Sequence, residues 1–82
     1  MEQMLFTMNT PLVQIVGGIW VRADQIISVS ADEENGKYWT EVEINHPQRS
    51  NYRRPYNTAQ EAMAERDRIA IAVNSALSSS RP

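Results

Sequence analysis

Residues 32–37 read DEENGK, and this stretch decides the fold. Asn35-Gly36 stands between two runs of strand-forming residues, and both residues tolerate the positive φ of a tight mirror-image turn. The stretch therefore predicts a two-residue β-hairpin. Its second strand, residues 38–45, alternates so that one of its faces is predicted to be buried. The side chains on that core face are Tyr38, Thr40, Val42 and Ile44.

Toward the N-terminus, the sequence predicts three more strands joined by short breaks. Residues 12–16 are rich in β-branched residues, and Gly17-Gly18 predicts a two-residue turn with positive φ at both positions. Residues 19–22 return as the next strand, and residues 25–31 lead into the hairpin. Residues 1–11 show no clear periodicity of apolar residues, and we predict an arm or a first short strand there.

A helix is predicted near the C-terminus. Thr58 and Glu61 have the capping-box spacing, and strong helix formers follow them as far as Leu77. The apolar stripe at 100° per residue consists of Ala59, Ala62, Met63, Ile69, Ala70, Val73, Ala76 and Leu77. Residues 78–82 predict a disordered tail.

Together these elements predict an α+β fold in one domain spanning residues 1–82. Residues 46–51 form a polar loop, and residues 52–56 form a last short strand that Pro55 places at a sheet edge. We expect an antiparallel sheet of four or five strands over residues 12–56, covered on one face by the helix. The other face is expected to stay open.

Composition narrows the possible functions. The 82 residues contain no cysteine and one histidine, which leaves no disulfide, no thiolate or multi-histidine metal site and no cysteine nucleophile. A domain this small buries only roughly 60% of its unfolded surface, so we expect a homo-oligomer. The net charge of −2 argues against duplex nucleic acid as a partner. The absence of a long apolar run and of a signal peptide predicts a cytoplasmic protein without a membrane partner.

The open sheet face is the first candidate functional surface. Alternation places Trp39 and Glu41 there, and Trp20 and Arg22 join them if the strands pair in sequence order. Two tryptophans away from the helix predict a subunit interface or a ligand platform. The alternative is a register shifted by one residue, which would place one tryptophan in the core.

The second candidate surface is an arginine- and tyrosine-rich segment just before the helix. Arginine forks bind phosphate or carboxylate, and tyrosine rings stack on bases, so the segment predicts an anionic ligand site. Its members are Arg49, Tyr52, Arg53, Arg54 and Tyr56. The alternative is an edge strand kept soluble by charge. Arg66, in the middle of the helical stripe, either adds a cation to a pocket or covers the core with its aliphatic stem.

The chain resembles small ββββ-α proteins of phages and prophages in several parts of its pattern. These parts are the order of strands, residues 17–29, the turn at Asn35-Gly36 and the helix opening at residues 56–62. The pattern is also similar to the flagellar FlbD-type domain. The likeness covers roughly residues 12–77 and carries no diagnostic motif. It implies a binder: an inhibitor of a host protein, or an oligomeric "sponge" that sequesters a nucleotide signal of bacterial immunity.

Two functions therefore remain open. One is a non-catalytic, oligomeric protein that binds a small anionic molecule of the cyclic nucleotide type, with no cofactor. The other is a protein-interaction module that covers a host protein with its tryptophan-bearing face. We expect no enzyme, because no catalytic constellation can be assembled around His46.

Overall fold

The computed structural model describes residues 10–79, with the side chain of Ser79 left out. Its elements in chain order are β1 (Leu12–Gln14), η1 (Val16–Gly18), β2 (Trp20–Arg22), η2 (Ala23–Gln25), β3 (Ile26–Glu34), β4 (Lys37–Ile44), β5 (Asn51–Tyr56) and α2 (Ala59–Ser79). Apart from residues 10 and 11, the arm expected over residues 1–11 lies outside the described residues.

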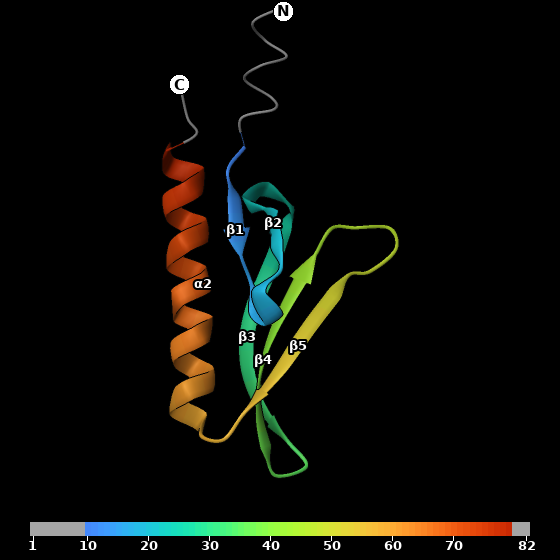
Figure 1. Cartoon of the computed structure of the whole chain (residues 1–82), viewed down its shortest axis with the longest axis vertical. Helices are drawn as coiled ribbons and strands as arrows, with labels where there is room; N and C mark the ends of the chain where they lie inside the picture. The colour runs from blue at the N-terminus through green and yellow to red at the C-terminus, as the bar shows by residue number, and fades with distance from the viewer. Residues whose placement is uncertain (1–9, 80–82) are drawn as a thin grey trace, which may run out of the picture.

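The predicted α+β class is confirmed, with the five strands divided between two antiparallel sheets (Figure 1). One sheet pairs β1 with β2, and the other has the order β3-β4-β5. Figure 1 shows α2 running alongside β1. Side chains of β1, β2 and α2 meet those of β4 in one buried cluster. The small sheet and the helix therefore cover the same face of the larger sheet.

The hairpin between β3 and β4 forms as predicted. Asn35 has φ 55° and Gly36 has φ 77°, and Glu34 pairs with Lys37 across the turn. The two positive φ angles match the right-handed twist of the flanking strands. Toward the other end of β3, the register shifts between Ile26 and Ser28, so Ile27 lies in a β-bulge and is exposed.

The connection between β1 and β2 is longer than predicted. Gly17 and Gly18 do have positive φ, at 73° and 75°, but they belong to a 3₁₀ turn. The last strand pair is Gln14 with Trp20, which leaves residues 15–19 as the loop. The prediction of a two-residue turn was wrong because Ile15 and Val16 leave the strand and enter the core.

The capping box begins α2 as predicted. The Glu61 backbone N–H donates to Thr58 Oγ1 over 3.1 Å, and the Thr58 N–H donates to Glu61 Oε1 over 3.2 Å. The helix continues through Ser79, two residues beyond its predicted end at Leu77. Residues 80–82 lie outside the described part of the chain.

The core lies between the covered face of the large sheet and the layer made by α2 and the small sheet. Its buried apolar residues are Val13, Ile15, Val16, Val21, Ala23, Val42, Ile44, Ala62 and Ile69. Thr40 is the buried polar residue there, and its Oγ1 donates to the Ala62 carbonyl oxygen over 2.7 Å. The helical stripe lies slightly differently from the prediction, since Met63 is 41% exposed and Ala72 packs on the core.

Candidate functional site

The arginines of β5 point to different faces of the sheet. Arg53 pairs with Glu41 across the β4–β5 ladder, and Arg54 pairs with the buried Thr40. Directly paired residues of antiparallel strands lie on the same face, so Arg53 lies on the open face and Arg54 on the covered face. The cluster predicted from sequence is therefore divided by strand alternation.

On the open face, Arg53 is occupied by its neighbours. Its guanidinium stacks on the Trp39 ring at 4.2 Å and forms an ion pair with Glu34 Oε1 at 2.6 Å. The hydrogen bond to Glu34 raises the pKa of Arg53 above its ordinary value. Three carboxylates interact with this arginine, those of Asp32, Glu34 and Glu41. The open face is thus acidic around Trp39, which disfavours an anionic ligand.

Trp20 and Arg22 do not join Trp39 on the open face. They belong to β2, in the separate two-stranded sheet, whose inner residue Val21 packs into the core. Trp20 is on the outer side of that sheet, 58% exposed, and thus on the opposite side of the molecule from Trp39. Arg22 is paired with Asp24 at 2.7 Å. The surface expected to contain both tryptophans does not form, because β1 and β2 fold back over the large sheet and do not extend it.

Two other members of the predicted cluster are engaged within the fold. Arg49 stacks on the Tyr52 ring at 4.3 Å, and its Nε donates to the Asn51 carbonyl oxygen over 3.2 Å. The Tyr52 ring packs against the core. Arg49 therefore covers a core residue, which is a structural contact.

Arg54 faces a hollow of about 360 Å³ between η1, β5 and α2, which we call the arginine hollow. Its lining residues are Gln14, Ile15, Gly17, Gly18, Arg54, Glu65 and Arg68. Within residues 10–79, the Arg54 guanidinium has no hydrogen bond or ion pair, and its ring contact with Tyr56 is long, at 5.7 Å. Its five N–H donors are open to solvent or to a ligand.

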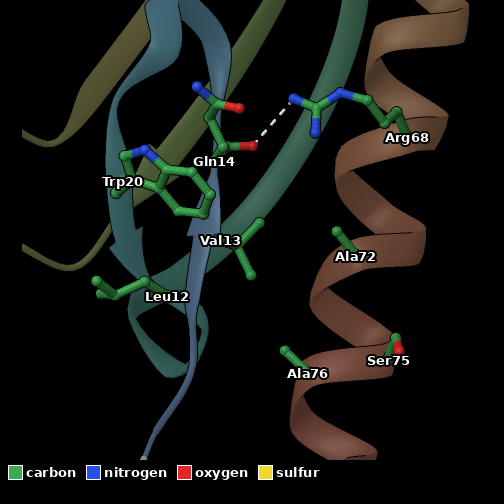
Figure 2. Close-up of a pocket in the computed structure, with 8 residues that line it drawn as sticks. All are labelled: Leu12, Val13, Gln14, Trp20, Arg68, Ala72, Ser75 and Ala76. Atoms are coloured by element: carbon green, nitrogen blue, oxygen red, sulfur yellow. Dashed lines mark hydrogen bonds between the residues drawn. The ribbon is translucent and has the colours of Figure 1, made fainter.

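Arg68 is the second cation of the arginine hollow. Its Nε and Nη2 each lie 2.8 Å from an oxygen of Glu65, and Nη2 also donates to the Gln14 carbonyl oxygen over 2.9 Å (Figure 2). The hydrogen bond from Arg68 lowers the pKa of Glu65, while burial raises the pKa of the neighbouring Tyr56 hydroxyl. With Arg54, Arg68 and Glu65 all charged, the hollow carries one net positive charge.

A second hollow, of about 380 Å³, lies on the outer side of β1 and β2 against α2. Figure 2 shows the residues that line this tryptophan hollow, which are Leu12, Val13, Gln14, Trp20, Arg68, Ala72, Ser75 and Ala76. Gln14 and Arg68 also line the arginine hollow, so the two hollows adjoin. Sequence reasoning missed Arg68 because its role depends on β1 lying beside α2, and no local pattern indicates that contact.

Arg66 lines neither hollow. Its Nε donates to Asp67 Oδ1 over 2.9 Å, so its head reaches a carboxylate at the surface. The head therefore points to the surface, while the expectation that the stem covers the core stays a prediction. His46 is likewise engaged locally, since its Nδ1 accepts the Gln48 backbone N–H over 3.2 Å.

Among residues 10–79, no three His, Asp or Glu side chains are grouped so that they could hold a metal ion. No helix in the same range is long and apolar enough to cross a membrane. Comparisons with protein-family models, curated proteins and solved structures found no match to the chain.

Proposed function

We propose that this chain is a non-catalytic binding protein that holds a small anionic molecule in the arginine hollow. The observation that carries the proposal is the state of Arg54. Its guanidinium faces a hollow that contains a second arginine, yet it has no hydrogen bond or ion pair within the described residues. Arg53, one residue earlier, is paired with Glu34 and stacked on Trp39.

The walls of the hollow favour a phosphate or carboxylate. The planar fork of Arg54 can donate two parallel hydrogen bonds to either group. Gly17 and Gly18 present backbone without side chains at the opposite wall. Their positive φ would strain any other residue, so this part of the wall consists of backbone without side chains. The hollow is within the range of roughly 300–1,000 Å³ that is typical of small-molecule sites.

The first test compares two neighbouring arginines. Isothermal titration with inorganic phosphate, pyrophosphate and citrate is carried out on wild type, Arg54→Gln and Arg53→Gln. We expect Arg54→Gln to weaken binding at least tenfold, because it removes the unpaired fork. The matched change Arg53→Gln should alter affinity less than twofold. Equal effects of the two substitutions, or no binding by wild type, would refute the proposal.

Glu65 provides a test in the opposite direction. Its carboxylate already holds Arg68 through two contacts of 2.8 Å, in competition with any anionic ligand. Glu65→Gln should therefore tighten binding of the same anions, while Glu43→Gln on the open face should leave it unchanged. A weaker affinity in Glu65→Gln would mean that Glu65 orders the site and does not compete with its ligand.

Self-association forms part of the proposal. The core is small, and the apolar side chains of Ile27 and Met63 are 59% and 41% exposed. We infer a homo-oligomer that sequesters its ligand, the form implied by the phage-type resemblance. Light scattering at several protein concentrations should give a mass that is a multiple of 9.4 kDa. A constant mass of one chain would contradict this part alone.

A protein-interaction module is the second candidate function. The observation that favours it is the open face of β3-β4-β5, which lies away from α2 and the small sheet and carries Trp39 beneath Arg53. In a pull-down from host lysate, Trp39→Ala should lose a partner that Arg54→Gln retains. Recovery of the same partner by both variants would remove this candidate.

A further inference from the structure

The two hollows on the α2 side differ in character although they share a boundary. The arginine hollow is charged, with Arg54, Arg68 and Glu65 in its lining. The tryptophan hollow is mainly apolar, with Leu12, Val13, Trp20, Ala72 and Ala76 in its lining. Gln14 and Arg68 belong to both, so one molecule can reach from the first into the second.

We propose that the ligand carries a planar aromatic ring beside its anionic group, and that this ring lies against Trp20. The inference rests on the proposed function, since it assumes that the anionic group is held at Arg54. A nucleotide is the ligand class that combines these two parts. Each part would lie in a hollow of its own, about 360 Å³ for the anion and about 380 Å³ for the ring.

Trp20 is suited to this contact because its ring is exposed. Trp20 is 58% exposed, and its side chain has no hydrogen bond or ring contact within residues 10–79. Its strand partner Gln14 lies on the same outer side of the small sheet. The small side chains of Ala72 and Ala76 form the helix wall and leave room for a ring (Figure 2). A bare anion would gain nothing from these apolar walls, whereas a stacked base is stabilised there.

The contrast with Trp39 strengthens the assignment. Trp39 is covered by Arg53, and its Nε1 donates to the Glu34 carbonyl oxygen over 3.3 Å. The carboxylates near it repel a phosphate. Of the two tryptophans, only Trp20 combines an exposed ring with a cation, Arg68, at the edge of its hollow.

Arg68 lies where the two hollows meet and fixes their geometry. Its bond to the Gln14 carbonyl oxygen ties α2 to β1 and holds the guanidinium in place. Arg68 is therefore a positioning residue for both parts of the ligand. This arrangement predicts that the ring and the anionic group bind with a fixed separation.

The experiment uses Trp20 as its own probe. In a Trp39→Phe background, Trp20 is the remaining tryptophan, and its fluorescence is followed during titration with AMP, GMP, adenosine and inorganic phosphate. We expect AMP or GMP to quench Trp20 and to bind about tenfold or more tightly than phosphate. Adenosine alone should bind more weakly than AMP. Trp20→Leu, followed by calorimetry, should reduce nucleotide affinity to that of phosphate and leave phosphate affinity unchanged.

Each unexpected binding result would contradict a different part of the proposal. Equal affinity for phosphate and nucleotide with unchanged Trp20 fluorescence would overturn the ring subsite and leave the anion site intact. Adenosine binding as tightly as AMP would overturn the two-part ligand. If neither phosphate nor nucleotide binds, the proposed function fails as well. Light scattering on Trp20→Leu adds a control: loss of oligomer mass with unchanged nucleotide affinity would place Trp20 in a subunit interface and refute the inference.

Discussion

The two faces of the β3-β4-β5 sheet differ most clearly at Arg53 and Arg54. On the open face, Arg53 is paired with Glu34, stacked on Trp39 and surrounded by further carboxylates. On the covered face, Arg54 lines a hollow and has no hydrogen bond or ion pair within the described residues. Arginines that are close in sequence therefore do not by themselves form a binding site. Whether each one can bind a ligand depends on the sheet face where it lies and on the charges next to it.

The largest effect is expected where the covered face is packed against the helix. Ile69 is fully buried, while Ile71 on the same helix is 68% exposed. Ile69→Ala should lower the free energy of unfolding by about 2–5 kcal/mol, because it removes apolar contacts and leaves a cavity. Ile71→Ala should stay within about 0.5 kcal/mol. Urea unfolding followed by circular dichroism measures both, and similar values would mean that α2 packs on a different side.

An intermediate effect is expected at the polar contact inside the covered face. Thr40 Oγ1 donates to the Ala62 carbonyl oxygen from a fully buried position. Thr40→Val keeps the shape and removes the hydrogen bond, so it should cost about 1 kcal/mol of unfolding free energy. Thr40→Ser keeps the donor and loses a methyl group. If Thr40→Val stabilises the protein relative to wild type, the Thr40 hydroxyl is not needed for α2 to pack on β4.

The smallest effect is a pH dependence at the edge of the covered face. The bond from Arg68 lowers the folded-state pKa of Glu65 below its unfolded value, which is about 4.3 for a free Glu. The resulting stabilisation is present above that unfolded value and is lost as the pH falls through the folded pKa. The difference in Tm between wild type and Glu65→Gln should therefore shrink below about pH 4. A difference that is constant from pH 7 to pH 3 would contradict the Glu65–Arg68 linkage.

Sequence reasoning succeeded where the signal was local. The turn at Asn35-Gly36 depends on two adjacent residues that accept positive φ, and the helix start depends on Thr58 and Glu61, three residues apart. Alternation along β4 also predicted its buried face, because period 2 leaves no freedom once one residue is assigned.

It failed where residues distant in sequence decide the outcome. The pairing of β1 with β2 was predicted, but β2 does not pair with β3, and this separation of the two sheets places Trp20 away from Trp39. Arg68 enters the candidate site only because α2 lies beside β1. Of the residues predicted from the arginine-rich segment, Arg54 reaches the proposed site, whereas Arg49 and Arg53 are held elsewhere.

The bond between Arg68 and Gln14 joins residues 54 positions apart, and this separation has a consequence for the order of folding. The β3–β4 hairpin closes over a two-residue turn, so its entropic cost of closure is low and we expect it to form early. The bond to Gln14 closes nearly the whole described chain and should form late. The candidate site is then absent from partly folded states, and a ligand bound there would slow unfolding without speeding formation of the hairpin.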